Sequence, residues 1–533
     1  MPVGHRYKIA NKKWEFEEIK KLSYQTFVEE IPQHQTNSTR THTDKFHREN
    51  IYIICTKDDK LLAMLAVRPK RPFSLDHKLP DLDKHLPQGR TICEIRLLAV
   101  TKKVRFTRVL KGLLEETVKY CIDNNFDMAV ISAILKQQKL YRHIGFIPFG
   151  PLVGTEQARF QPMYLTVEAH AKSKTPMLET EKPRKANFLP GPVDISPKVR
   201  SAFEAPPISH RSKEFLKTFN ETKSMLKELV SAKHVEILTG SGTLANDVVA
   251  GQLAQLSSRG LILSNGDFGE RLITHADNFG LDYKTIRLPW TSPFDYQLIQ
   301  KTLSDDPSIK WIWAAHLETS TGMLNNIDWL KAICQNNDAL LCLDCVSSIG
   351  NTPIDLSDVY LASTSSAKGL SSFPGLAMVF YNRRLKPPRK KLPNSLDLYK
   401  YSNAGGVAYT ISSNHISALH TSIKDIDIAK KTEQISAKSD LLRERLAEIG
   451  MKPVCEKKHA ADCVITLSLN EKLNSIEVGD SLKLAGFSVN YESNYLSKRN
   501  WIQICLMSEV PIRLIDEMLI SLNEITQNHR PWS

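Results

Sequence analysis

"STSSAKGLSS", residues 363–372, sets a single lysine among small residues and hydroxyls. Lysine is normally found at a wet surface, whereas this setting is more typical of the wall of a pocket. The stretch has two interpretations. Lys368 is either an ordinary loop lysine or a nucleophile that forms a Schiff base, and the second needs a pocket built by the rest of the chain.

The chain around this stretch has 533 residues, of which 41% are hydrophobic and 24% charged. It is too long for one core, so two or three domains are expected. Residues 170–186 are polar, charged and proline-containing, which is the composition of a linker between domains 1–169 and 187–533. No run of eighteen or more apolar residues occurs, so no membrane span is expected.

Cysteine usage and charge indicate the setting of the protein. The nine cysteines form no CxxC pair, and Cys342, Cys345 and Cys505 lie in apolar runs, which predicts a reduced, cytoplasmic protein without a metal site. The net charge of +13 fits either a basic enzyme or attraction to anionic partners such as coenzyme A or an acidic carrier protein. No nucleic-acid-binding motif supports a nucleic-acid partner.

Strand-like and helix-like segments alternate through residues 187–533. Apolar runs such as "HVEIL", "GLILSNG", "IKWIWAAH", "ALLCLD", "VYLAST" and "LAMVFYN" read as strands, with helical segments after the first three. This order predicts an α/β domain with a mostly parallel sheet. Ligands of such sheets bind beyond the carboxyl ends of the strands, which is where the polar clusters of this chain fall.

Two of these clusters suit an anion and a cation. In "LTGSGTLAND", residues 238–247, Ser241, Gly242 and Thr243 begin a helix and either bind a phosphate or only cap the helix. In "LLCLDCVSSIG", residues 340–350, Asp344 ends an apolar strand. A carboxylate there needs a cationic partner, such as a protonated pyridine nitrogen, or else caps a neighbouring loop.

Two further clusters suit a flat ring. Phe268 in "SNGDFGERL" follows a strand and either stacks on a ring or belongs to the core. Thr319 in "AHLETSTGMLNNI" lies in a hydroxyl-rich segment that either bonds a ring oxygen or forms a polar turn.

Together these segments resemble the class V, fold type I, pyridoxal-phosphate aminotransferases, in the branch of alanine–glyoxylate and 2-aminoethylphosphonate aminotransferases. The resemblance runs from "FLPGPVDISPKV" (188–199) to about residue 525. It implies a large domain with a mostly parallel sheet and a small C-terminal α/β domain. "PISHRSKEF" (207–215) resembles the substrate-side loop of phosphoserine-type members, which makes His210 and Arg211 candidate substrate-binding residues.

The resemblance also assigns roles at the cofactor. Lys368 would carry pyridoxal 5'-phosphate and move the proton, and Asp344 would pair with the pyridinium nitrogen. Thr410 in "VAYTISSNH" would reach the phosphate of a second subunit, which implies a homodimer. The other expected cofactor contacts are the phosphate turn Ser241, Gly242 and Thr243, the ring-face residues Phe268 and Val346, and Thr319 near the ring hydroxyl.

The chain departs from the family's pattern at two positions. Ala367 stands where the family usually has a polar residue, and Gln503 in "WIQICLMSEV" aligns with the arginine that grips the substrate carboxylate. Glutamine cannot form that bidentate, charge-assisted pair, and Arg211 and Arg499 are possible substitutes. A lyase or acyl-condensing enzyme, or a non-catalytic scaffold with a degenerate acyltransferase, stays open as an alternative.

The first domain resembles the GNAT acyltransferases over residues 93–150, which read as strand, basic turn, amphipathic helix, strand and short helix. The resemblance implies that the turn with Arg105 and Arg108 binds the acyl donor. It places Tyr141 where many such enzymes keep an acid for the leaving thiolate, and the alternative is a packed aromatic residue. The turn lacks the usual second and third glycines.

The upstream half resembles the acyl-homoserine-lactone synthase and long-chain N-acyl amino acid synthase branch. The matching positions are Phe27, Asp44, Arg68, Glu94 and Arg96, with His47 in place of the motif's second acidic residue. The resemblance implies N-acylation of an amine by an acyl thioester of coenzyme A or acyl carrier protein. Glu94 is the candidate base, or else it forms a salt bridge to an arginine.

The chain is therefore expected to be a bifunctional enzyme with small-molecule amine and keto or aldehyde substrates. The C-terminal domain would transfer an amino group, and the N-terminal domain would convert an amine to an amide.

Overall fold

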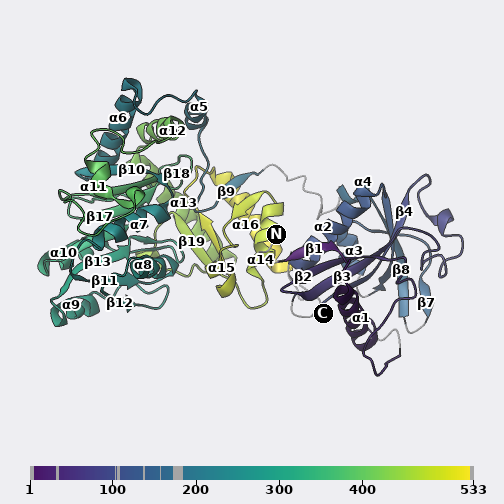
Figure 1. Ribbon diagram of the computed structural model, residues 1–533. Helices are drawn as coiled ribbons and strands as arrows, with labels where there is room; N and C mark the ends of the chain where they lie inside the picture. The colour runs from purple at the N-terminus through teal and green to yellow at the C-terminus, as the bar shows by residue number, and fades with distance from the viewer. Residues whose placement is uncertain are drawn as a thin grey trace. The chain divides into compact units, whose positions relative to one another are not determined.

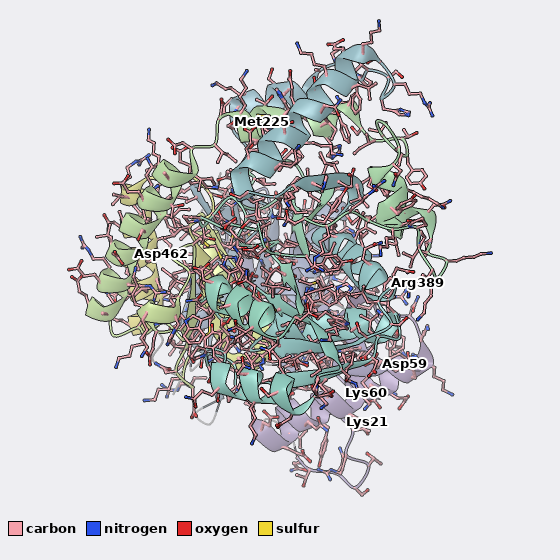
Figure 2. All side chains as sticks on the ribbon, turned by 90° about the vertical axis from the view of Figure 1, so that its left-hand side faces the viewer. Lys21, Asp59, Lys60, Met225, Arg389 and Asp462 are labelled. Atoms are coloured by element: carbon pink, nitrogen blue, oxygen red, sulfur yellow. The ribbon has the colours of Figure 1, made fainter. Side chains whose placement is uncertain are left out.

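The computed structural model describes residues 5–31, 35–101, 104, 108–135, 138–155, 158–171 and 184–528. The chain divides into two compact units, Met1–Glu181 and Lys182–Ser533 (Figure 1). Charged side chains such as Lys60 and Arg389 stand on the surface of their units (Figure 2). Within the described ranges, we find no helix with the length and apolarity that a bilayer crossing requires.

The first unit is built on one sheet whose described strands follow the order β1-β2-β3-β4-β5-β8-β6, with β7 beside β8. The strands are β1 (Arg6–Ile9), β2 (Ile51–Lys57), β3 (Lys60–Arg68), β4 (Ile92–Val100), β5 (Met128–Ile134), β6 (Ile147–Pro148), β7 (Val153–Thr155) and β8 (Ala158–Thr166). Its helices are α1 (Lys13–Tyr24), η1 (Gln25–Glu30), η2 (Leu82–His85), α2 (Arg108–Asp123), α3 (Gln138–Ile144) and α4 (Val167–Ala171).

Helices α1 and α2 cover opposite faces of this sheet. Tyr52 and Ile54 of β2 pack with α1, whereas Ile53 and Cys55 of the same strand pack with α2. This division follows from the strand geometry, because successive side chains point to opposite faces. The predicted order of strand, helix, strand and short helix over residues 93–150 is confirmed by β4, α2, β5 and α3.

The second unit contains a sheet of seven described strands in the order β10-β18-β17-β16-β13-β11-β12. They are β10 (His234–Gly240), β11 (Arg259–Ser264), β12 (Tyr283–Arg287), β13 (Ile309–Ala315), β16 (Leu340–Asp344), β17 (Leu361–Ser365) and β18 (Gly375–Tyr381). Among these described strands, β18 runs antiparallel to both of its neighbours, β10 and β17, and the other pairs are parallel. The predicted mostly parallel sheet is confirmed.

Helices bury both faces of this sheet, and the side chains of β13 show how. Trp311 and Trp313 belong to one core cluster with α7 and α8, whereas Ile312 and Ala314 belong to the other. The helices of this large domain are α5 (Pro197–Glu204), α6 (Lys213–Val230), α7 (Gly242–Leu253), α8 (Asp267–Asn278), α9 (Tyr296–Asp305), α10 (Ile327–Asn336), η5 (Asn394–Leu396), α11 (Leu398–Ser402) and α12 (Ser413–Lys424). Parallel strands covered on both faces read as continuous apolar runs, which explains the sequence pattern.

A smaller α/β domain completes the second unit around a separate core. Its strands are β9 (Ala186–Phe188), β19 (Val464–Ser468), β20 (Phe487–Val489) and β21 (Trp501–Cys505), and its helices are α13 (Ile428–Glu448), η6 (Lys457–His459), α14 (Ser475–Leu484), α15 (Asn494–Arg499) and α16 (Ile512–Asn528). A short hairpin of β14 (Leu317–Glu318) and β15 (Met323–Leu324) leaves the large sheet and contacts this domain, because Ala461 N donates to Gly322 O at 2.8 Å.

The predicted linker 170–186 is described only at its two ends. Ala171 closes α4, and Ala186 opens β9, which pairs with β20. The remainder of that segment lies outside the described residues.

Gly350 allows the loop after β16 to touch the loop that carries Lys368, and Gly405 is a glycine of similar φ without such a contact. Gly350 has a φ of +83°, and a Cβ atom placed there would lie 2.5 Å from the backbone carbonyl of Gly369. Gly405 has a similar φ of +63° but open space around it. Substitution at Gly405 would therefore cause backbone strain alone, whereas substitution at Gly350 would cause strain and a steric clash.

We expect Gly350→Ala to lower the free energy of unfolding by about 3 kcal/mol, from left-handed strain and overpacking together. Gly405→Ala should cost only about 1 kcal/mol, because it meets strain alone. Denaturant unfolding of both variants and the wild type measures the difference. Equal shifts in the two variants would contradict the close contact of the two loops.

Candidate functional site

Lys368 lies in the turn after β17, at the carboxyl end of the parallel strands. Its Nζ donates to Ser347 Oγ at 2.7 Å and lies 5.3 Å from the centre of the Phe268 ring. Burial lowers the pKa of Lys368, and the negative charge of Asp344 opposes part of that shift. A lowered pKa leaves more of the amine neutral, which is the nucleophilic form.

Asp344 ends β16, and the residue is only 7% exposed. Its Oδ1 accepts from the backbone N–H of Val346 at 2.9 Å, and its Oδ2 accepts from Asn246 Nδ2 at 2.8 Å. Asn246 is itself held by Ser363, whose hydroxyl donates to Asn246 Oδ1 at 2.6 Å. These bonds fix the carboxylate in a buried place where an opposite charge would be strongly favoured.

The phosphate turn predicted from the sequence forms the start of α7. Ser241 is the N-cap residue, yet its side chain makes no capping hydrogen bond, and Ser241 and Thr243 are exposed. A Cβ atom at Gly242 would lie 2.8 Å from Val346, so the turn packs against the residue predicted for the ring face. The helix start therefore offers N–H groups and hydroxyls to an anion beside Val346.

Phe268 is positioned by a buried carboxylate. Glu318 is fully buried, and its oxygens accept from the backbone N–H groups of Phe268 at 3.3 Å, Gly269 at 3.0 Å and Ser320 at 3.1 Å. Burial raises the pKa of Glu318, whereas these hydrogen bonds lower it, and the net direction is upward. Glu318 thus ties the start of α8, and with it Phe268, to the β14 hairpin.

Gln503 is engaged inside the protein. Its Nε2 donates to Thr319 O at 2.6 Å and to Thr466 Oγ1 at 2.8 Å, and its Oε1 accepts from Asn490 at 3.0 Å. The side chain is fully buried. Thr319 in turn bonds Ser347 Oγ at 2.5 Å, which leads to Lys368. Both amide hydrogens of Gln503 are therefore used to hold the segment with Thr319, and its substrate-binding role stays a prediction.

Three predicted site residues lie outside this cluster. His210 and Arg211 lie in the loop between α5 and α6, where Ile208 N donates to Ser413 Oγ of α12 at 3.0 Å. Thr410 is exposed and lines a cavity of about 430 Å³ with residues of β10 and α11. The described contacts of these residues do not include Lys368 or Asp344.

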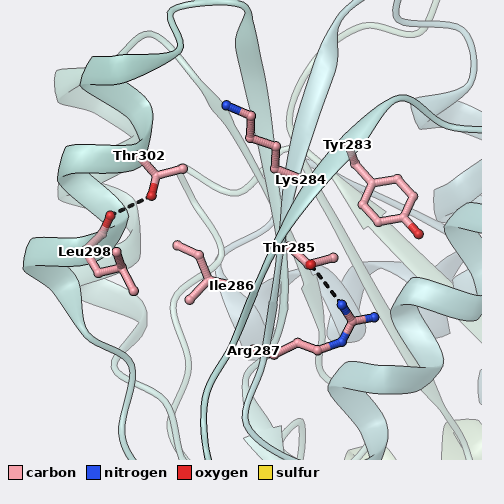
Figure 3. A pocket seen from close by; sticks show the side chains of 7 residues that line it. All are labelled: Tyr283, Lys284, Thr285, Ile286, Arg287, Leu298 and Thr302. Atoms are coloured by element: carbon pink, nitrogen blue, oxygen red, sulfur yellow. Dashed lines mark hydrogen bonds between the residues drawn. The ribbon is translucent and has the colours of Figure 1, made fainter.

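A second hollow, of about 680 Å³, lies between β12 and α9 (Figure 3). Two polar side chains of its lining form hydrogen bonds with other lining residues. Arg287 donates to Thr285 Oγ1 at 3.0 Å, and Thr302 donates to Leu298 O at 2.7 Å. None of the predicted site residues lines it.

The residues around Lys368 fit a phosphorylated, protonated aromatic ring. The absence of a side chain at Gly191 lets the backbone there approach Lys368, because a Cβ atom at this position would lie 3.2 Å from the Lys368 side chain. The site combines the amine of Lys368, the buried carboxylate of Asp344, the aromatic ring of Phe268 and the exposed start of α7. Each of these groups matches one part of pyridoxal phosphate.

In the first unit, Glu94 is 2% exposed and supports a loop. Its oxygens accept from the backbone N–H groups of Ser74 at 2.7 Å and Leu75 at 3.0 Å, and Arg96 Nε lies 3.7 Å away. Burial raises the pKa of Glu94 despite these contacts. Besides the two predicted alternatives, a catalytic base or a salt bridge, Glu94 therefore has a third role: it anchors the loop that contains Ser74 and Leu75.

The other predicted residues of this unit gather around Phe46. Arg96 forms a bidentate pair with Asp44, at 3.0 and 3.1 Å. The guanidinium groups of Arg68 and Arg96 lie 3.7 and 4.8 Å from the centre of the Phe46 ring. Phe27 is buried in the neighbouring core beside α1. Asp44, Arg68 and Arg96 therefore form one charged cluster around Phe46, whereas Phe27 belongs to the hydrophobic core.

Strands β4 and β5 separate just beyond Glu94. Within the described strands, they pair from Ile92 to Glu94 and no further. Leu97 has a φ of +54°, which interrupts the regular edge of β4. Ser132 of β5 has a buried hydroxyl without a hydrogen-bond partner among the described residues. Such a separation leaves backbone groups and this hydroxyl free to bind a ligand.

Arg105 and Arg108 are the two residues predicted to bind the acyl donor. Arg105 lies outside the described residues, and of Arg108 only its place as the first residue of α2 is described. Tyr141 lies in α3 against Phe146, at 5.9 Å between ring centres. Burial raises the pKa of Tyr141 to about 12, so its hydroxyl keeps its proton at neutral pH.

Comparison with known families identifies both units. Residues 201–490 match the family model of class-V aminotransferases, and residues 18–166 match that of N-acyl amino acid synthase FeeM. The first match covers more than half of the chain. The chain belongs to the class-V aminotransferase family, a family of pyridoxal-phosphate enzymes, and carries an N-terminal domain of the N-acyl amino acid synthase type.

Relatives of known name match the second unit. The soluble hydrogenase 42 kDa subunit of Anabaena cylindrica is 34% identical over 250 residues, which are 44% of this chain and 65% of that subunit. The chain thus spans slightly less than two thirds of that relative. The 2-aminoethylphosphonate–pyruvate transaminase of Pseudomonas putida is 25% identical over 298 residues, 52% of this chain and 80% of the transaminase.

A solved structure confirms the predicted fold type. Alanine–glyoxylate aminotransferase from Nostoc sp. superposes with a TM-score of 0.60 at 24% identity, covering 65% of this chain and 96% of that enzyme. At this identity the likeness concerns the fold alone.

Sequence reasoning missed three residues that touch the site. Asn246 bonds Asp344, Ser347 accepts from Lys368, and Glu318 holds the start of α8. Each lies within a quoted motif, one to three residues from a predicted site residue. The available signal was a polar side chain on a segment that is otherwise buried.

We expect Asn246→Leu to weaken pyridoxal phosphate binding about tenfold or more, because Asp344 loses a buried, charge-assisted hydrogen bond. Ser363→Ala should have a smaller effect, since the amide of Asn246 stays in place. Fluorescence titration of the cofactor-free protein measures both dissociation constants. Asn336→Leu, on the exposed side of α10, is the matched control, and equal affinities in all variants would refute the role of Asn246.

Proposed function

We propose that the second unit transfers an amino group with pyridoxal phosphate. The observation that carries this proposal is the arrangement of Lys368 and Asp344 at the carboxyl ends of adjacent strands, with Phe268 beside the lysine. When bound, the cofactor supplies an electron sink for the bonds at the reacting carbon. The family match supports the same reaction class.

The residues of the chain divide this work. Lys368 would hold the cofactor and, once released from it, would move a proton at the reacting carbon, for which its lowered pKa is suited. Asp344 keeps the ring nitrogen protonated. Phe268 and Val346 bound the ring faces, and the residues at the start of α7 bind the phosphate. Thr319 orients the ring hydroxyl with Ser347.

We further propose that the first unit acylates an amine with an acyl thioester of coenzyme A or acyl carrier protein. The amine nitrogen attacks the thioester carbon, the amide bond forms, and the thiolate leaves. Glu94 accepts the proton of the amine, directly or through water, and its raised pKa makes it a stronger base than an exposed carboxylate. Tyr141 gives its proton to the thiolate, and Arg105 and Arg108 bind the donor's phosphates.

The two activities form a sequence in which one product feeds the other. Amino transfer to a keto or aldehyde compound yields an amine, and acylation converts that amine to an amide. The presence of both family matches on one chain supports this order. A homodimer is part of the proposal, since Thr410 is exposed, as a residue serving a second subunit would be.

Lys368→Ala tests the amino-transfer site. Wild-type protein with added pyridoxal phosphate should show a visible absorption band that borohydride traps on residue 368, as peptide mass spectrometry would show. Lys368→Ala should bind the cofactor reversibly and resist trapping at position 368, because the amine that bonds to the cofactor is removed. Lys424→Ala, exposed near the end of α12, is the matched control. A protein that never takes up the cofactor would end the proposal for this unit.

A crossed pair of variants tests the coupling. With an amino donor, a carbonyl compound and an acyl thioester, wild type should form an amide. Lys368→Ala should lose amide formation from the carbonyl compound but keep it from the corresponding amine. Glu94→Gln should slow acylation about 10²- to 10⁴-fold, because the base is removed, and should leave amino exchange intact, because the second unit is unchanged.

Mass spectrometry of the products separates the outcomes of this experiment, with Glu18→Gln on α1 as the control. An acyltransferase unit that rejects every amine produced by the second unit would refute the coupling. Loss of carbon dioxide or cleavage of the donor without amino exchange would indicate a lyase.

A further inference from the structure

An array of aromatic rings leads from Phe268 to the surface of the second unit. The ring centres of Phe268 and Tyr495 lie 6.3 Å apart, those of Tyr495 and Trp290 6.4 Å, and those of Trp290 and Trp501 6.2 Å. Tyr495 is buried, whereas the two tryptophans are half-buried. The array therefore starts beside Lys368 and ends where solvent can reach it.

Arg499 lies at the outer end of this array. Its guanidinium carbon is 3.4 Å from the centre of one Trp290 ring and 5.6 Å from that of Trp501. Within residues 184–528, it has neither an ion-pair nor a hydrogen-bond partner. The contact with Trp290 holds the guanidinium over the ring and leaves its N–H donors without a partner among residues 184–528. This state suits an incoming carboxylate or other acidic group.

The inner part of the site offers no comparable donor. Gln503 has given both amide hydrogens to Thr319 and Thr466. Arg271 lies 4.7 Å from the Phe268 ring centre, but its charge is balanced by Asp267, 2.7 Å away. An acidic group attached to the reacting carbon would thus find no free cation here among the described side chains, whereas one farther along the substrate would find Arg499.

We propose that Arg499 is the anion-binding residue of the amino-transfer site and that the site takes amines whose acidic group is separated from the amino-bearing carbon by several atoms. This inference rests on the proposed amino-transfer function and names its substrate class. The chain between the two groups would lie along Tyr495 and Trp290, whose faces suit methylene groups.

The test uses the full-length protein loaded with pyridoxal phosphate and follows the loss of its visible band on mixing with amines. The probes are alanine, 3-aminopropanoate, 5-aminopentanoate and pentylamine, which vary the distance to the carboxylate and then remove it. We expect 5-aminopentanoate to react at lower concentration than alanine and pentylamine.

Arg499→Gln should raise the half-saturating concentration of 5-aminopentanoate about tenfold or more, because a charge-assisted bond is lost, with little change in the maximal rate. The same variant should leave pentylamine unchanged. Arg499→Lys should recover part of the loss, since it keeps the charge but not the planar stack. Arg513→Gln, which alters an exposed arginine of α16, is the matched control.

The outcomes separate this inference from the function on which it rests. Preference for alanine, or an Arg499→Gln variant with unchanged half-saturation for 5-aminopentanoate, would overturn the role of Arg499 while amino transfer stands. A holoenzyme whose band responds to none of the amines, although borohydride traps the cofactor on Lys368, would instead refute amino transfer itself. Trp290→Ala supplies a second variant, expected to weaken 5-aminopentanoate more than pentylamine.

Discussion

The carboxylate of Asp344, 7% exposed at the end of β16, imposes the constraint on which the second unit depends. A buried charge is costly unless hydrogen bonds and an opposite charge compensate it. The backbone of Val346 and the amide of Asn246 supply the first kind of compensation. Lys368 supplies part of the second, since the charge of Asp344 acts to raise the pKa of Lys368. A protonated ring nitrogen would complete the balance.

The sheet topology makes this compensation possible. Parallel strands end at one edge, so Asp344 at the end of β16 and Lys368 after β17 meet although they lie on different segments. The loops that follow β16 and β17 pack against each other, because Gly350 and Gly369 lack side chains where their backbones touch. The antiparallel strand β18 covers the far side of β17 and leaves this edge open to the segment around Gly191.

How much of this could be read from the sequence depends on the range of each interaction. The strand and helix order was predictable, because apolar runs and helix starts are local, and so was the position of Asp344 at a strand end and of the turn that begins α7. The roles given to Lys368, Asp344 and this turn stay predictions. The bond from Asn246 to Asp344 joins residues 98 apart, and that from Gln503 to Thr319 joins residues 184 apart. No periodicity reports such pairs. For the same reason, the support of Glu94 for the loop at Ser74 was not foreseen.

The two units use burial in the same physical way on groups of opposite charge. Burial disfavours the charged form, so it lowers the pKa of Lys368 and raises the pKa of Glu94, each toward neutrality. For Lys368, the result is a larger share of neutral amine, which is the nucleophile. For Glu94, the result is a carboxylate that holds a proton more strongly. Both proposed reactions need an amine to lose its proton before it bonds to carbon, and each unit meets that need with a buried titratable group.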